Sequence, residues 1–186
     1  MRAPTTRVAA IAAGVIVALI GVVALAGLPL YVFPPAEPIG KADLVYVIGP
    51  PQKYRVEVER ALRAEGVAGH SLYSVPTHGG WSAARLPVCH EEGVDCVHPE
   101  PFTTKGEIAL LTKYAPAHDV DRTIILTFTP HVLRTRYILE KCYHGDATVV
   151  AVDQHLSLAD WIYQYAYQSF ALVKAWITPC ADSSDL

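Results

Sequence analysis

An imidazole and a guanidinium stand close together where an apolar run gives way to a helical pattern. Residues 122–129 predict a buried strand, and Pro130 suits the first turn of the helix that follows. His131 then lies in that first turn, and Arg134, three residues on, lies near it on the helix surface. Because free backbone N–H groups and the helix dipole favour an anion at this end, the pair suits a phosphate or a carboxylate.

A structural interpretation of the same segment stays open. Thr129 then only caps the helix, and the arginines are solvated or form ion pairs, for example Arg136 with Glu140 four residues on. The residues alone do not decide between a binding site and this alternative.

The segment from Thr104 to Glu107 also has two interpretations. Its spacing is that of a capping box, in which the threonine accepts from a free N–H and the glutamate reaches back. In the functional interpretation, Glu107 is a general base or a hydrogen-bond acceptor for a ligand. Gly106 inside a helix costs about 1 kcal/mol relative to alanine, which indicates a close approach of another group.

Strands that alternate with helices must position these segments. The predicted strands are residues 42–48, 70–75, 122–129 and 147–152. The predicted helices are residues 52–65, 104–114, 130–143 and 158–177, and residues 76–102 are expected to be rich in loops. This order predicts an α/β, Rossmann-like fold, with a parallel sheet covered by helices on both faces.

Ligands of open parallel sheets bind at the carboxyl ends of the strands. Gly49, Pro50 and Pro51 follow the first strand, so this loop and the turn at residues 127–131 are expected to meet there. The two prolines lack backbone donors, so the loop binds anions poorly through N–H groups. Arg55, just beyond the loop, either adds charge to the crevice or is a surface residue.

The chain lacks the sequence motifs of several functional classes. The chain has no Gly-x-Ser-x-Gly elbow, no Walker A motif and no Rossmann glycine fingerprint, and the sequence names no cofactor. The net charge of -3 gives no support for nucleic acid binding.

The N-terminal segment is long and apolar enough to span a bilayer. No charged residue occurs from Val8 to Phe33, and Arg2 and Arg7 precede this run. The positive-inside rule then places the N-terminus in the cytoplasm, which predicts a single-pass cell-membrane protein with an extracytoplasmic C-terminal domain. The alternative is a cleaved signal peptide, since residues 24–26 have the small-x-small form of a cleavage site.

The expected organisation has three parts. Residues 1–33 form a cytoplasmic stub and transmembrane helix, residues 34–41 a proline-rich linker, and residues 42–186 the α/β domain.

The four cysteines all lie beyond the apolar segment, which favours disulfides in an oxidising compartment. Three pairings exist, of which Cys89–Cys96 with Cys142–Cys180 is preferred but not decided. Histidines beside Cys89 and Cys96 raise a metal site as the alternative, although the spacing matches no common zinc pattern. The aromatic helix at residues 158–177 is expected to cover the core, with a membrane-surface position as its alternative.

The ordered segments resemble the YdcF-like family, an envelope-associated group that includes SanA and ElyC and is described as a domain of unknown function. The resemblance covers residues 42–152, and Cys142 with the upstream cysteine pair resembles actinobacterial members in particular. The matching pieces are the first strand with Gly49, Arg55 ahead of Ala61 and Leu62 with Gly66, Ser74 after a strand, Thr104 to Glu107, and Thr127 to Arg136.

The resemblance implies a Rossmann-like domain, often behind a membrane helix, linked to envelope barrier function and to peptidoglycan or lipid-carrier metabolism. No reaction is assigned securely to the family. Its members often have glycines where this chain has Pro50 and Pro51, and Ser-Gly-Gly where it has residues 74–76. Both departures stiffen the crevice.

We therefore expect a membrane-anchored envelope protein that binds an anionic ligand, either a phosphorylated lipid-linked molecule or a small molecule. The expected catalytic residues are His131 and Glu107. The expected ligand-binding residues are Gly49, Arg55, Ser74, Thr104 and Arg134. The alternatives are a non-catalytic envelope sensor or scaffold and a purely structural domain.

Overall fold

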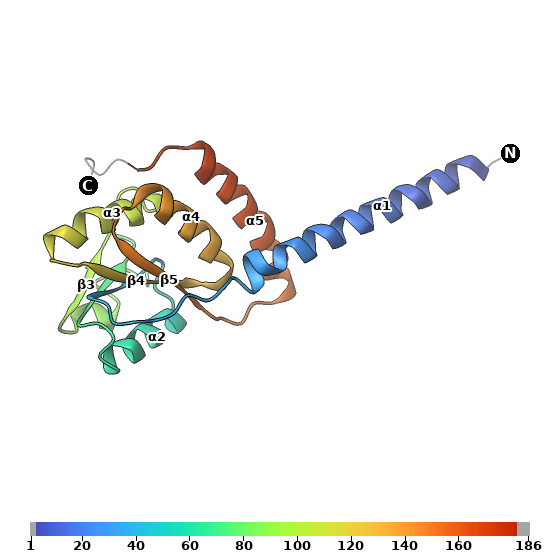
Figure 1. The fold of residues 1–186 in the computed structure, drawn as a ribbon. Helices are drawn as coiled ribbons and strands as arrows, with labels where there is room; N and C mark the ends of the chain where they lie inside the picture. Colours follow the sequence, from blue (N-terminus) through green and yellow to red (C-terminus); the bar gives the residue numbers. More distant parts are fainter. Residues whose placement is uncertain (1–2, 182–186) are drawn as a thin grey trace.

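A computed structural model describes residues 3–181 and, in detail, the side chains from residue 7 onward. An N-terminal rod, α1 (Ala3–Gly27) with a π-helical turn η1 (Leu28–Val32), leads into one α/β domain (Figure 1). The elements of the domain are β1 (Leu44–Val47), α2 (Lys53–Ala64), β2 (His70–Ser74), η2 (Pro87–His90), β3 (Val94–Val97), α3 (Thr104–Ala117), β4 (Arg122–Phe128), η3 (Thr129–His131), α4 (Val132–Cys142), β5 (Asp146–Val152) and α5 (Leu158–Ile177).

The five strands form one parallel sheet in the order β3-β2-β1-β4-β5, which confirms the predicted α/β fold. The strand order reverses between β1 and β4, so the loops after these two strands flank the crevice where such sheets bind ligands. Strand β3 was missed by sequence reasoning because residues 94–97 lie among glycines and prolines and form only a half-buried edge strand.

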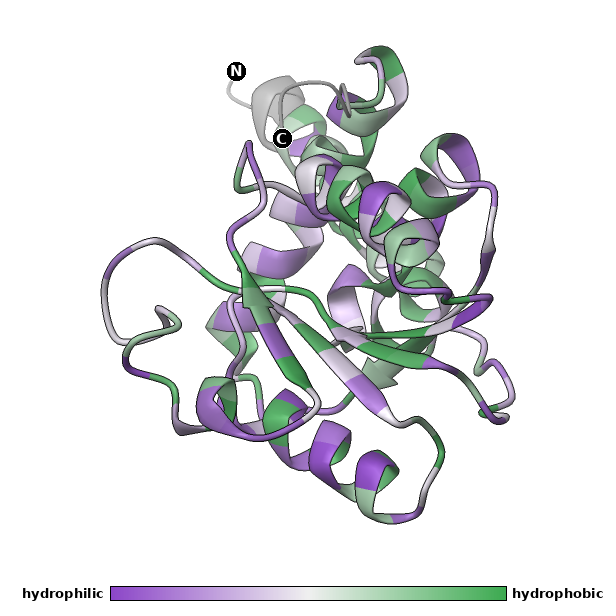
Figure 2. Cartoon of the chain, turned by 90° about the vertical axis from the view of Figure 1, so that its left-hand side faces the viewer, coloured by the Kyte–Doolittle hydropathy of each residue, from purple (hydrophilic) through white to green (hydrophobic). Residues whose placement is uncertain are grey.

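Helices cover both faces of the sheet. α2 lies on one face, at the bottom of Figure 2, and packs with Leu86 and Val88 against Val45 and Val47. α3 and α4 cover the opposite face. Alternate residues of β1 thus enter two separate cores, as expected for a strand buried on both sides.

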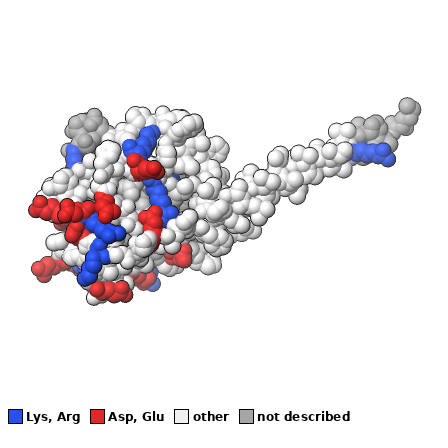
Figure 3. Space-filling model, in the orientation of Figure 1, with Lys and Arg blue, Asp and Glu red and all other residues white. Residues whose placement is uncertain are grey.

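The rod formed by α1 carries the predicted membrane-spanning segment. Its apolar stretch Arg7–Val32 is exposed except near its C-terminal end, where Gly27 and Tyr31 are buried against the domain, and both its length and its composition suit a bilayer span or a signal sequence. Figure 3 shows no charged side chain along the rod except near its N-terminal end, away from the domain. Arg2, part of the orientation argument, and the domain's last five residues lie outside the described part of the chain.

The linker is docked on the domain through Glu37. This carboxylate forms an ion pair with Arg136 and accepts a hydrogen bond from the N–H of Val149 on the edge strand β5 at 3.0 Å. Arg136 therefore pairs with the linker, and the alternative in which Glu140 is its partner is wrong. Because Glu37 occupies an N–H of an edge strand, it also protects that edge from other chains.

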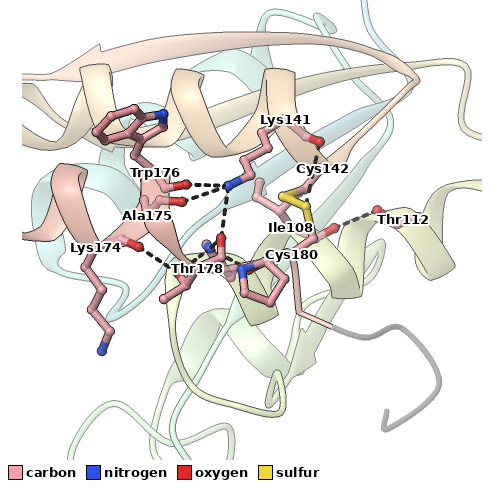
Figure 4. The surroundings of a disulfide bond; sticks show 11 residues. Ile108, Thr112, Lys141, Cys142, Lys174, Ala175, Trp176, Thr178 and Cys180 are labelled. Carbon is pink, nitrogen blue, oxygen red and sulfur yellow. Dashed lines mark hydrogen bonds between the residues drawn. A yellow bond between two sulfur atoms is a disulfide. The ribbon is translucent and has the colours of Figure 1, made fainter.

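Both preferred disulfides are present. Cys89–Cys96 closes the loop before β3, and Cys142–Cys180 joins the end of α4 to the segment after α5 (Figure 4). Beside the second bond, the Lys141 ammonium donates to three carbonyls at the end of α5. Four cysteines thus act as two covalent links, and no metal-binding cluster occurs among residues 3–181.

Candidate functional site

A cavity of about 890 Å³ opens above the carboxyl ends of β1 and β4. Its walls come from the loop after β1, the start of α3, the β4–α4 turn and the length of α5. The polar side chains that line it are Thr103, Thr104, Lys105, Glu107, His131, Arg134, Tyr163, Gln164, Tyr167, Gln168, Lys174 and Thr178. Three of the predicted residues, Glu107, His131 and Arg134, therefore share one concavity.

Glu107 does not serve as half of a capping box. The cap of α3 is Thr103, whose hydroxyl accepts from the Gly106 N–H at 3.2 Å. The Glu107 carboxylate accepts from the N–H of Gly49 at 2.6 Å, across 58 residues of chain. It thus ties the start of α3 to the loop after β1, and the residue lines the cavity.

Two glycines allow this close approach. A Cβ on Gly106 would lie 1.9 Å from the carbonyl oxygen of Pro101, so the helix start and the preceding loop are in contact as expected. A Cβ on Gly49 would lie 2.7 Å from the Ser74 carbonyl oxygen and 3.2 Å from the ring of Phe102. Any other residue at these positions would push the two loops apart.

The carboxyl group of Glu107 is buried. Burial raises the pKa of its carboxyl, and this effect outweighs those of the nearby Ser74 hydroxyl, the Gly49 N–H and the charges of Arg55 and Arg134, which lower it. The carboxyl is therefore easier to protonate than one in water, which suits a group that exchanges a proton or donates a hydrogen bond to an anion.

His131 is buried and hydrogen-bonded on both ring nitrogens. Nδ1 lies 2.8 Å from the Thr127 hydroxyl, and Nε2 lies 3.2 Å from the Thr104 hydroxyl. Burial and then the charges of Arg134 and Arg55 hold the pKa of the imidazole well below its usual range. The ring is therefore neutral near pH 7, with one nitrogen donating and the other accepting.

Arg134 provides positive charge to the cavity wall. Its guanidinium lies 5.4 Å from the centre of the Tyr167 ring on α5. The Nε atom is buried and has no hydrogen-bond partner among the described residues. Burial lowers the pKa of the guanidinium, while Tyr167 and Glu107 oppose this change. A buried donor without a partner is unfavourable, and the Arg134 side chain as a whole lines the cavity.

Arg55 does not line the cavity. Its guanidinium donates to the carbonyls of Ile48 at 3.3 Å and Pro50 at 2.5 Å, and it lies over the Phe128 ring. Burial lowers its pKa to about 10, against the opposing charge of Glu107. Arg55 thus shapes the loop after β1 from behind, and its charge reaches the cavity only through space.

Ser74 is also behind the wall rather than in it. Its hydroxyl is buried beside Gly49 and has no hydrogen-bond partner of good geometry within residues 3–181. Of the seven predicted site residues, the five that line the cavity are Gly49, Thr104, Glu107, His131 and Arg134.

Helix α5 supplies a wall that sequence reasoning did not assign to the site. Tyr163, Tyr167 and Lys174 line the cavity from this helix. Lys105, on the opposite side, donates to the carbonyls of Thr178 and Pro179, which follow α5. The sequence signal for this wall is the near absence of charge in an aromatic-rich helix, a pattern that also predicts a helix covering the core.

A second buried carboxylate, Glu59 on α2, was also missed. It accepts from the Tyr73 hydroxyl at 2.6 Å and from the Ser71 hydroxyl, and Arg63 lies 3.2 Å from it. This group lies on the α2 face of the sheet, away from the cavity. Its only sequence signal was its position four residues after Arg55 and three before Leu62, on the buried face of the helix.

Comparisons with models of known protein families, with curated proteins and with solved structures gave no match for this chain. What the site does has to follow from its own geometry.

Proposed function

We propose that the chain is a membrane-anchored envelope protein whose cavity binds an anionic, phosphorylated ligand, as its resemblance to the YdcF-like family also suggests. The observation that carries the proposal is the Arg134 side chain, which lines the cavity together with Lys105 and Lys174. A guanidinium at a cavity wall forms charge-assisted hydrogen bonds with phosphate oxygens, and arginine is the side chain best suited to phosphate.

The charges around the cavity support an anion. Arg134, Lys105 and Lys174 line it, whereas Glu107 is the only acidic residue among the described lining residues. Burial is the main cause that lowers the pKa of Lys105, and the ammonium groups of Lys141 and Lys174 lower it further. These three lysines therefore lie near one another. A site of this size and charge fits a phosphate group that carries a larger substituent.

Binding without catalysis is the second candidate, and one observation favours it. Both ring nitrogens of His131 are occupied by threonine hydroxyls, and a Glu107 oxygen is occupied by Gly49. A catalytic role requires His131 to exchange the Thr104 bond for the ligand. A sensor role requires no such change.

Titration of the full chain in lipid nanodiscs tests the proposal. The probe is a short-chain alkyl phosphate, and binding is followed by isothermal calorimetry. Arg134→Gln should weaken binding by at least about tenfold, because one charge-assisted hydrogen bond is lost. Arg85→Gln is the matched control, since this arginine is exposed and lies outside the cavity. Equal affinities for the two variants would refute the proposal.

A further inference from the structure

Helix α5 exposes most of its large apolar side chains. On the face toward the domain, Trp161, Tyr165 and Leu172 are half-buried. The other residues of this face are small or amide-bearing: Gln168 and Ala175 are buried, and Gln164 and Ala171 are half-buried. Their spacing of four, three and four residues defines one face of the helix. Large apolar residues occupy the outer face instead, namely Leu158, Ile162, Tyr163, Tyr167, Phe170, Val173, Trp176 and Ile177.

This apolar face is too extended to be incidental. Phe170 is 78% exposed and Trp176 is 69% exposed, and Lys174 is the single charged residue from Trp161 to Ile177. Contiguous exposed apolar surface on a domain marks a binding surface for a protein or a membrane. The expectation that α5 covers the core is therefore wrong for most of its large side chains.

The position of α5 indicates which partner covers this face. Its first half packs on the inner end of the membrane-capable rod: Tyr165 donates to the Ala24 carbonyl at 3.2 Å, and the Tyr31 and Ser169 hydroxyls lie 2.9 Å apart. The rings of Tyr31 and Tyr165 meet edge to face. Figure 1 shows α5 running across the base of α1, with α4 on its inner side.

The surrounding surface agrees with this position. On the face that Figure 3 shows, the part of the domain next to α1 has no charged side chain, and charged side chains gather on the part further away. The exposed apolar residues Leu30 and Phe33 continue the patch from α5 toward α1. A bilayer crossed by α1 would begin at the level of this patch.

We propose that α5 lies on the outer surface of the bilayer as a second membrane contact, with its aromatic face in the interfacial region. Tyrosine and tryptophan favour this region because they have an apolar body and a polar tip. Tyr163, Tyr167 and Phe170 are exposed and also line the cavity, so this contact holds one rim of the cavity at the membrane surface. The proposal rests on the anchoring by α1 but not on the ligand.

Quenching of tryptophan fluorescence by brominated lipid tests the contact. The full chain is placed in nanodiscs whose phosphatidylcholine carries bromine near the headgroup end of the acyl chains. A variant with Trp81→Phe and Trp161→Phe leaves Trp176 on α5. The matched variant with Trp161→Phe and Trp176→Phe leaves Trp81, which precedes residues that pack on the α2 face of the sheet.

The emission of Trp176 should fall about twofold or more in brominated nanodiscs, because bromine quenches on contact, while that of Trp81 should stay unchanged. The unmodified chain is a second measurement that needs no variant to fold: two of its three tryptophans lie on α5, so it should also be quenched. Lack of quenching in both samples would overturn the proposal. Protection of Trp176 that depends on protein concentration, without quenching, would instead indicate a second copy and would overturn it too. Ligand affinity is not read in this assay, so its failure is separate from that of the phosphate titration.

Discussion

The domain contains two buried glutamates, one on each face of the sheet, and they differ in how completely their neighbours satisfy them. Glu59 accepts from two hydroxyls and lies 3.2 Å from Arg63, which is itself held by Glu91. Glu107 accepts a well-formed hydrogen bond from Gly49, the nearby Ser74 hydroxyl lowers its pKa, and its arginine neighbours act only through space. One carboxylate is enclosed in a network, and the other lies beside an open cavity.

Burial of a carboxylate therefore does not by itself mark a site. A fully paired acid such as Glu59 stabilises the packing of a helix on a sheet. Glu107 lies near Arg134, whose Nε is buried without a hydrogen-bond partner among the described residues, which is unfavourable. Groups left unpaired next to a cavity indicate a ligand more strongly than burial does.

The largest effect on stability should come from removing the enclosed carboxylate, Glu59. Glu59→Ala leaves two buried hydroxyls without their acceptor and removes one of the two carboxylates that pair with Arg63, so we expect the free energy of unfolding to fall by about 3–5 kcal/mol. Chemical denaturation of the full chain in detergent micelles measures this. Glu57→Ala is the control, because this glutamate is exposed on the same helix. A loss below about 1 kcal/mol in Glu59→Ala would show that the network is not structural.

The second largest effect concerns the pH dependence of stability, which depends on the neutral imidazole of His131 at the cavity. Since the folded state holds the pKa of His131 well below 6.5, its contribution to stability is present above pH 6.5 and is lost as the pH falls further. Between pH 7 and 5, the parent should lose about 2 kcal/mol more unfolding free energy than His131→Gln does. Equal losses in the two chains would mean that the imidazole becomes charged freely within the fold.

A matched pair of serines on β2 compares the two clusters directly. Ser71 donates to Glu59, whereas Ser74 lies near Glu107 without a partner of good geometry. Ser71→Ala should lower the unfolding free energy by about 1–2 kcal/mol, and Ser74→Ala by less than about 0.5 kcal/mol. Thermal unfolding of both variants measures the difference. The reverse order would place the structural network at the cavity.

The smallest effect should be on ligand affinity. Because the pKa of Glu107 is raised, lowering the pH protonates it and removes a negative charge from the cavity. A phosphodiester probe, which keeps a single charge, should therefore bind about threefold tighter at the lower pH, since the open cavity screens the charge. Glu107→Gln should remove this dependence. Weaker binding of the parent at low pH would instead make the ionised carboxylate part of the binding site.

Local patterns were sufficient to predict the frame of this protein. Apolar runs separated by helical spacing predicted the parallel sheet, and they placed the turns at Gly49 and His131 at one edge. The i, i+3 spacing predicted that His131 and Arg134 would lie together. The charge-free stretch from Val8 to Phe33 predicted the helix that could span a membrane. Each inference depends on neighbours in the chain, which a sequence displays directly.

Contacts between distant segments decided the rest. The spacing of Thr104 and Glu107 predicted a local capping box. In the structure Thr103 caps α3 instead, and the Glu107 carboxylate accepts a hydrogen bond from Gly49. Arg55 turned inward to the loop carbonyls because α2 places it beneath them. The apolar residues of α5 have a helical period whichever way they face, so only its packing against α1 and α4 shows that they point outward. A periodic pattern defines a face, and the tertiary structure decides what that face meets.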